Sequence, residues 1–150
     1  EIFQEKRYQE IGLDQVFVQD NLSRSSQGVI RGLHFQKTKP QGKLVTCLRG
    51  KVFDVVVDLR VGSETLGKMF SIILDSDNRN QLWIPPGFAH GFSVLSESAD
   101  FFYKCTDYYE PSDEGGILWS DPDLAVDWLV SNPIVSEKDQ KLPFLKGVIG

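Results

Sequence analysis

The sequence predicts an all-β domain, a sandwich or a barrel, with only a few short helices. Short runs rich in Val, Ile, Phe and Tyr recur along the chain, and Gly, Pro, Asn, Asp and Ser separate them. At 150 residues and 41% hydrophobic composition, the chain can bury one core, and its length does not call for a second domain. We therefore expect a single domain over residues 1–150.

The predicted strands follow one another closely along the chain. Alternation is clearest in residues 51–60, where apolar side chains from Phe53 to Leu59 take one face and the other face includes Asp54 and Asp58. One face of this strand should pack, while the other has acids to accommodate. The strand-like segments are residues 15–20, 28–36, 43–50, 51–60, 68–75, 81–85, 90–96 and 100–109.

Tight turns and helices complete this outline. The sequences RGK at 49–51 and SDN at 76–78 are typical of tight turns, which predicts that the strands on either side are antiparallel neighbours. Only residues 4–10 and a short segment near 136–141 look helical, the second because Ser136 can begin a helix.

Net charge and hydropathy restrict the classes of function that fit this chain. The net charge of −5 and the pI near 5.0 argue against sequence-independent binding of nucleic-acid phosphates, unless basic residues gather in one cleft. No apolar run approaches the roughly 20 residues of a membrane helix, and EIFQEKRYQE is not a signal peptide, so we expect a cytoplasmic protein. Cys47 and Cys105 lie in apolar strand-like runs and should be free, buried thiols.

The segment GVIRGLHFQ, residues 28–36, places an arginine and a histidine on a strand that should pack a core. Strict alternation would send Arg31 and His34 to opposite faces. Gly32 lies between them, and a one-residue bulge there would turn both side chains to the same face. The alternative is a hydrogen-bonded core histidine beside an arginine at the sheet edge.

The second histidine, His90, follows a turn forced by Pro85, Pro86 and Gly87. With Lys43 and Tyr103, the predicted strands carry more polar groups than a core tolerates unpaired, which indicates a lined pocket. Two chemistries fit such a pocket. One is a metal site built from His34, His90 and a carboxylate such as Asp54, and the other is acid–base chemistry with a histidine base.

Six motifs cover nearly the whole chain: QDNLSRSSQGVIRGLHFQ, QGKLVTCLRGKVFDVVVDLR, GSETLGK, QLWIPPGFAHGF, YKCTDYYEP and EKD. In their order and spacing, these motifs resemble the dTDP-4-dehydrorhamnose 3,5-epimerase family. The resemblance implies a cupin-like jelly roll, also called a double-stranded β-helix, that uses no metal or other cofactor and is usually a homodimer. It implies inversion of C3 and C5 of dTDP-4-dehydro-6-deoxy-D-glucose, a step toward dTDP-L-rhamnose and surface polysaccharide.

The resemblance also implies catalytic roles. A ketone at C4 makes the hydrogens on C3 and C5 acidic, because the resulting carbanion is delocalised as an enolate onto O4. By resemblance, His34 is the base and Asp139 orients it, while Tyr103 is the acid on the other side of the ring. Lys43 is the cation near O4 that stabilises the enolate. Asp54 is expected to support His90 by pairing with it.

The substrate-binding residues carry over in the same way. Arg31 and Lys138 match positions that bind the diphosphate, which suits the planar fork of arginine. Tyr109 matches a residue that stacks on thymine. The family has a strand with an Arg-Gly-Phe motif before the position of Glu1, and we expect this domain to lack that strand. The remaining substrate-binding candidates are Glu1, Gln19, Asn21, Lys43, His90 and Glu114.

Two other functions remain open at this point. A relative that inverts only C3 or only C5 of a dTDP-4-keto-6-deoxysugar would keep the same base and acid. A cupin-fold protein that binds sugar nucleotides without turnover would bind the substrate but not exchange its hydrogens.

Overall fold

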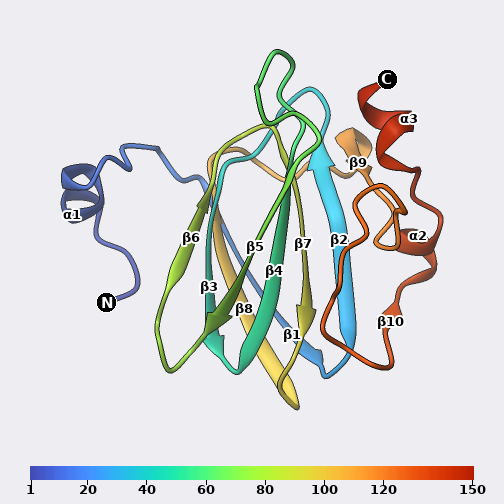
Figure 1. The fold of residues 1–150 in the computed structure, drawn as a ribbon. Coiled ribbons are helices and arrows are strands. Elements are labelled where there is room, and N and C mark those ends of the chain that lie inside the picture. Colours follow the sequence, from blue (N-terminus) through green and yellow to red (C-terminus); the bar gives the residue numbers. More distant parts are fainter.

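The structure is a computed structural model that describes residues 1–150. It consists of two mainly antiparallel β-sheets that face each other, with short helices outside them (Figure 1). The strand order is β1-β8-β3-β6 in the first sheet and β10-β2-β7-β4-β5 in the second, with β9 also paired to β2. Eight main strands, with β1, β8, β3 and β6 in one sheet and β2, β7, β4 and β5 in the other, define a jelly roll. The predicted fold class is therefore confirmed.

The element bounds follow the chain. The first sheet contains β1 (Gln19–Ser26), β3 (Lys43–Arg49), β6 (Gln81–Ile84) and β8 (Ser98–Cys105). The second contains β2 (Val29–Gln36), β4 (Lys51–Asp58), β5 (Met69–Asp75), β7 (Phe88–Val94), β9 (Glu114–Gly116) and β10 (Ile134–Val135). The helices are α1 (Glu5–Glu10), the 3₁₀ turn Pro111–Asp113, α2 (Glu137–Gln140) and α3 (Leu145–Ile149).

The two predicted turns exist, but the pairing inferred from them is wrong. β3 pairs with β6 and β8, and β4 pairs with β5 and β7, so the turn at 49–51 carries the chain from one sheet to the other. The turn between β5 and β6 does the same. Gly50 has a φ of +87°, which suits a sharp turn, but a sharp turn does not determine whether its two strands pair or separate.

The strand expected at 15–20 is also displaced. The observed strand β1 spans Gln19–Ser26, and its side chains alternate between exposed and partly buried. Its sequence QDNLSRSS has almost no apolar residues, because the inward side chains face a polar pocket, and so hydrophobic alternation could not find it. Both expected helices are confirmed: Gln4 caps α1 and Ser136 caps α2, each by accepting a backbone N–H on its side chain.

Apolar side chains pack on both faces of the second sheet. Inside the barrel, residues such as Val56, Phe92 and Phe101 form one cluster. On the outer face, Val55 and Val57 pack against the C-terminal segment, which crosses the sheet after β9. Strand β4 therefore has no water-facing side, and the acids on its inward face, Asp54 and Asp58, are fully buried.

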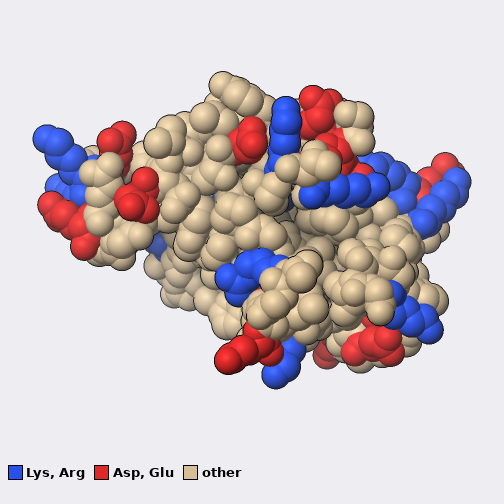
Figure 2. All heavy atoms as spheres, turned by 90° about the horizontal axis from the view of Figure 1, so that it is seen from above, with Lys and Arg blue, Asp and Glu red and all other residues tan.

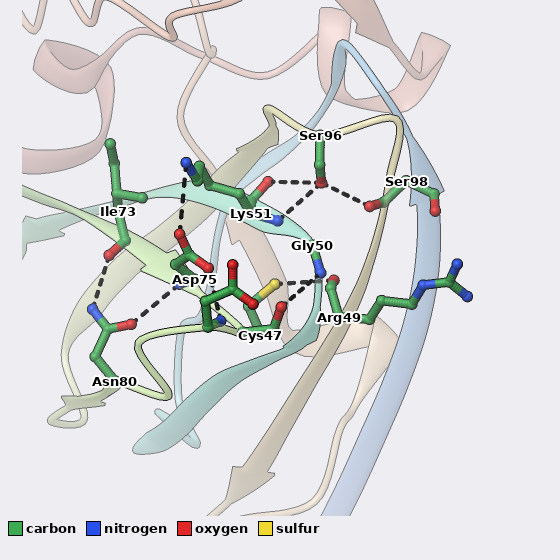
Figure 3. A network of polar contacts seen from close by, with 11 residues as sticks. Cys47, Arg49, Gly50, Lys51, Ile73, Asp75, Asn80, Ser96 and Ser98 are labelled. Carbon is green, nitrogen blue, oxygen red and sulfur yellow. Dashed lines mark hydrogen bonds and ion pairs between the residues drawn. The ribbon is translucent and has the colours of Figure 1, made fainter.

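A hydrogen-bond network closes one end of the barrel (Figure 3). The hydroxyl of Ser96 accepts a bond from the Lys51 N–H and donates to the carbonyl of Ser98. The Gly50 N–H donates to Ser76, and Lys51 forms an ion pair with Asp75. These bonds tie together the turns that join the two sheets, so the opening into the barrel lies at the other end.

The N-terminal arm projects to one side of the barrel, and α1 lies at its outer end (Figure 1). The ring of Phe3 packs against Tyr8 and Phe17, and the ammonium of Lys104 lies 4.9 Å from its centroid. Cys47 and Cys105 are both free and buried, as predicted. No helix in the chain is long and apolar enough to cross a membrane.

Candidate active site

A cavity of about 410 Å³ lies between the two sheets. Only three of its twelve lining residues are hydrophobic, although the rest of the barrel interior is apolar. Viewed down onto the open end, acidic and basic side chains are interspersed, and neither sign forms a continuous patch (Figure 2). The cavity is lined by Ser23, Arg31, His34, Lys43, His90, Gly91, Phe92, Phe101, Tyr103, Ser136, Lys138 and Asp139.

The bulge predicted in β2 is confirmed. Arg31 pairs with Phe92 and His34 with His90, so the register shifts by one residue between them, and both side chains line the cavity. Gly32 lies at the shift with a φ of +120°, and a Cβ there would come within 2.7 Å of the backbone of β7. Only glycine fits this position, and the bulge that it permits brings arginine and histidine together.

His34 is paired with Asp139. Its Nε2 lies 2.7 Å from Asp139 Oδ1, and the backbone N–H of Gly32 donates to Asp139 Oδ2 at 3.0 Å. Burial opposes ionisation of this carboxyl, but the hydrogen bonds from His34 and Gly32 outweigh it and lower the pKa of Asp139. A charged Asp139 holds the Nε2 proton, which leaves Nδ1 of His34 as a proton acceptor.

The second histidine forms a similar pair deeper in the barrel. His90 Nε2 lies 2.8 Å from Asp54 Oδ2, and both side chains are buried. Burial raises the pKa of Asp54 and lowers the pKa of His90, so the surroundings disfavour charge on both groups. The other carboxylate oxygen, Asp54 Oδ1, has no hydrogen-bond partner. The nearby ammonium of Lys43 opposes the rise in the pKa of Asp54.

Tyr103 stands on the opposite sheet from His34. It lies on β8, where its backbone neighbours are Asn21 and Val45, and its side chain lines the same cavity. Burial raises the pKa of this phenol, so it stays protonated beyond its usual range. The Lys43 ammonium lies 5.4 Å from the centre of the Tyr103 ring, and burial lowers the pKa of Lys43.

The remaining candidates surround the entrance. Arg31 donates from Nε to the buried hydroxyl of Ser25 at 3.0 Å, and Lys138 forms a hydrogen-bonded ion pair with Glu114. This pairing raises the pKa of Lys138. A smaller adjoining cavity of about 60 Å³ is lined by residues that include Asn21, His34, Lys43, Tyr103, Tyr109 and Glu114.

Gln19 connects two of the expected nucleotide-binding residues. Its side-chain amide donates to Asn21 Oδ1 at 3.0 Å, and its oxygen accepts the backbone N–H of Tyr109 at 2.9 Å. Glu1 is the exception among the candidates. It forms an ion pair with Arg7 and lines a separate pocket with Tyr8, so within one chain it does not join the others.

The alternative metal site is not assembled. His34 and His90 each bond to their own carboxylate, and no group of three or more His, Cys, Asp or Glu side chains comes together as metal ligands. Ser25 and the two phenylalanines of the cavity wall were not predicted from the sequence. Ser25 could have been found from its i, i+6 spacing to Arg31 across the turn at Gly28, whereas Phe92 and Phe101 look like ordinary core residues.

The fold and the site together define a jelly-roll protein in which a half-buried histidine–carboxylate pair faces a phenol across a cavity lined mainly by polar residues. Comparison with known proteins narrows this class. A family model described as dTDP-4-dehydrorhamnose 3,5-epimerase matches residues 1–147, and the chain belongs to this family.

Individual relatives agree with this assignment. The dTDP-4-dehydrorhamnose 3,5-epimerase of Methanothermobacter thermautotrophicus is 52% identical over 143 residues, which cover 93% of this chain and 77% of the relative. A crystal structure of a 3,5-epimerase from Legionella pneumophila, in complex with dTDP-4-keto-L-rhamnose, superposes with a TM-score of 0.93 at 54% identity, covering 97% of this chain and 79% of that one. A dTDP-4-dehydrorhamnose 3-epimerase from Streptomyces niveus is 45% identical over 87% of this chain and 63% of its own length.

Proposed function

We propose that this chain inverts C3 and C5 of dTDP-4-dehydro-6-deoxy-D-glucose and produces dTDP-4-dehydro-L-rhamnose. The observation that carries the proposal is the placement of His34, with Asp139 behind it, on one wall of the cavity and Tyr103 on the facing wall. Inversion requires a proton to leave one side of a carbon and return on the other. A base and an acid on opposite walls meet this requirement.

Each inversion has two proton transfers. Neutral His34 takes the proton from C5 or C3 through Nδ1, and the electron pair of the broken C–H bond moves into the enolate, whose negative charge lies mainly on O4. Tyr103 then donates its phenolic proton to the same carbon from the other face. Solvent exchange returns a proton to the tyrosinate and removes one from the imidazolium, and the second carbon reacts in the same way.

The negative charge on O4 of the enolate needs a nearby positive charge, at a position where water does not screen their attraction. Lys43 is half-buried in the cavity wall, and no carboxylate forms an ion pair with its ammonium, which leaves it available to O4. A preorganised charge aimed at a developing oxyanion typically contributes 10²–10³-fold in rate, roughly 2.7–4 kcal/mol. His90 is the second group that can donate to O4: a protonated Asp54, which burial favours, donates to His90 Nε2 and leaves the proton of the neutral imidazole on Nδ1.

The entrance suits a nucleoside diphosphate. Arg31 and Lys138 supply positive charge there, and Arg31 presents a planar fork that fits phosphate oxygens. Tyr109 is exposed enough to stack on a pyrimidine ring, and Gln19, Asn21 and Glu114 lie within reach of its polar edges. The homodimer and the cytoplasmic location expected from the sequence stay predictions, and a role for Glu1 in substrate binding requires a second copy of the chain.

The main alternative is inversion at C3 alone, the activity named for the relative from Streptomyces niveus. Incubating the protein with the keto sugar in heavy water, and locating deuterium in the product, distinguishes the possibilities. The proposal expects deuterium at both C3 and C5 together with the L-configured sugar. Label at one carbon alone would support a single-site epimerase, and tight binding without any label would support a binding protein without turnover.

A further inference from the structure

Two side chains without polar atoms lie among the mainly polar residues that line the cavity. Three of its twelve lining residues are hydrophobic: Phe92, Phe101 and Tyr103, and the last carries the phenol assigned to catalysis. Phe92 lies two residues beyond His90 on β7, and Phe101 lies two residues before Tyr103 on β8. Because alternate residues of a strand share a face, both rings lie directly beside the reacting groups, on the side toward the closed end of the barrel.

The two rings form a continuous apolar floor. Their centroids are 4.2 Å apart and their planes differ by 19°, and the ring of His90 stacks on Phe101 at 5.8 Å. Phe92 and Phe101 are 6% and 1% exposed, so they are held by packing from below and cannot move aside easily. Neither ring can accept or donate a strong hydrogen bond to a sugar hydroxyl.

The proposed substrate has one substituent that such a surface can hold. If the diphosphate on C1 lies at the entrance with Arg31 and Lys138, and O4 faces Lys43, then C4 and its neighbours reach the interior of the cavity. There, C3 carries a hydroxyl and C5 carries the C6 methyl. The methyl is the only substituent of the sugar ring without a polar atom, and burial next to aromatic carbon is favourable for it.

We propose that Phe92 and Phe101 form the seat of the C6 methyl group and make the enzyme selective for 6-deoxy sugar nucleotides. The inference rests on the proposed function and adds the feature that selects its substrate. A hydroxymethyl group in the same place would bury a hydroxyl against two phenyl rings. A hydrophobic site rejects an added hydroxyl by about 10²-fold in kcat/KM.

The experiment compares two substrates: dTDP-4-dehydro-6-deoxy-D-glucose and its 6-hydroxy counterpart, dTDP-4-dehydro-D-glucose. The readout is the ratio of the two kcat/KM values for deuterium incorporation, measured on one protein sample so that any unfolded fraction cancels. The unsubstituted protein should prefer the 6-deoxy substrate by about 10²-fold. Phe92→Ala removes half of the floor and should reduce the preference to about tenfold or less. Phe92→Tyr keeps the ring and adds a hydroxyl, and it should reduce the preference in the same direction.

The control is Val94→Ala, on the same strand and the same face, two residues deeper and fully buried but outside the cavity lining. It disturbs the core cluster that also contains Phe92 and Phe101, but it removes no atom from the cavity lining, and it should keep the full preference. The inference is overturned if the unsubstituted protein prefers the 6-deoxy substrate by less than threefold, or if Phe92→Ala and Phe92→Tyr both keep its preference. A protein that labels neither substrate would contradict the proposed function itself, which is a different result.

Discussion

The chain contains two histidines, and each is bonded to an aspartate at nearly the same distance, 2.7 Å for His34–Asp139 and 2.8 Å for His90–Asp54. Their surroundings differ. The His34 side chain is 28% exposed and faces the entrance, whereas His90 is 6% exposed and lies deeper. Hydrogen bonds lower the pKa of Asp139, but burial raises the pKa of Asp54.

This difference shows that a histidine–carboxylate pair does not by itself make a base. The carboxylate behind the histidine must stay charged, and the histidine must reach water in front, so that it can accept a proton and pass it on. The outer pair meets both conditions, because Gly32 and His34 both donate to Asp139 and His34 faces the entrance. The inner pair is almost fully buried, and burial disfavours the charge that His90 would carry after accepting a proton. We therefore expect the inner pair to hold and polarise O4 and not to accept a proton from carbon.

The sharpest test of this comparison exchanges each histidine for asparagine. His34→Asn should reduce deuterium incorporation at both C3 and C5 by about 10²–10⁴-fold, the usual effect of losing a general base, while binding of dTDP stays nearly unchanged. His90→Asn should slow the reaction less and should retain label at both carbons. Incorporation within tenfold of the unsubstituted protein in His34→Asn, or a larger loss in His90→Asn, would reverse the assignment of the two pairs.

A second test concerns the wall opposite the outer pair. In Tyr103→Phe the base remains, so a proton can still leave carbon, but no acid stands on the other face to complete the inversion. Formation of the L-sugar should fall by about 10²-fold, and label should fall by less because protonated His34 can return a deuteron to the original face. NMR of the recovered substrate measures both. Equal losses of label and inversion would mean that Tyr103 holds the substrate or helps to form the enolate.

The sequence predicted more of this site than of the strand pairing. The bulge at Gly32 could be inferred because a glycine inside a strand often marks a bulge, and it brought Arg31 and His34 to one face as expected. The jelly-roll pairing could not be inferred from alternation, because a turn such as Gly50 looks the same whether its strands pair or separate into two sheets. Strand β1 was misplaced because its inward side chains, among them Asn21, face a polar cavity and not a core.

The roles assigned to His34, Tyr103 and Lys43 came from resemblance to the family and remain predictions. The difference between the outer pair, with its ionised carboxylate, and the almost fully buried inner pair depends on burial and on the backbone N–H of Gly32. A sequence pattern contains neither. Phe92 and Phe101 illustrate the same limit, since only the three-dimensional cavity distinguishes them from other core aromatics.

The pH dependence tests the charge near the inner pair. Burial lowers the pKa of Lys43 and raises the pKa of Tyr103, so the first shift moves toward neutral pH and the second moves away from it. We therefore assign the loss of activity at high pH to deprotonation of Lys43. In Lys43→Arg the cation keeps its proton, because arginine has a pKa above about 12. The alkaline limb of kcat/KM should therefore move to higher pH, even if the maximum rate falls. An unchanged limb would assign it to another group.

The two aspartates should also differ in how they affect stability. The pKa of Asp139 is lower in the folded protein than in the unfolded chain, so its charge adds stability above about pH 4, which is lost as the pH falls through the folded value. The pKa of Asp54 is raised, so its contribution has the opposite sign, and ionisation above about pH 4 costs stability.

Urea unfolding at pH 7 and at pH 3 measures both effects. Asp139→Asn should lower the free energy of unfolding at pH 7 by about 1.5–3 kcal/mol, the range for hydrogen bonds to a charged group, and should lower it less at pH 3. Asp54→Asn should cost less at pH 7 than Asp139→Asn does, because burial opposes ionisation of Asp54 and its charge adds no stability to the fold. The comparison fails if Asp54→Asn is the more destabilising of the two at pH 7.

The smallest expected effect concerns a buried partner at the entrance. Ser25 is 6% exposed and accepts a hydrogen bond from Nε of Arg31, which leaves the outer nitrogens of the guanidinium directed toward the cavity. As Asp54 does for His90, Ser25 orients a group without touching the substrate. Ser25→Ala should therefore raise KM by about 3–10-fold, the value of one hydrogen bond of roughly 0.7–1.4 kcal/mol, and leave kcat unchanged.

The exposed neighbour Ser26 provides the control, and Ser26→Ala should change neither constant. In an Arg31→Ala background, Ser25→Ala should have no further effect on KM, because the group that it orients is gone. An additive loss in the double variant, or a fall in kcat in Ser25→Ala alone, would mean that Ser25 acts on the fold or on the sugar and not through Arg31.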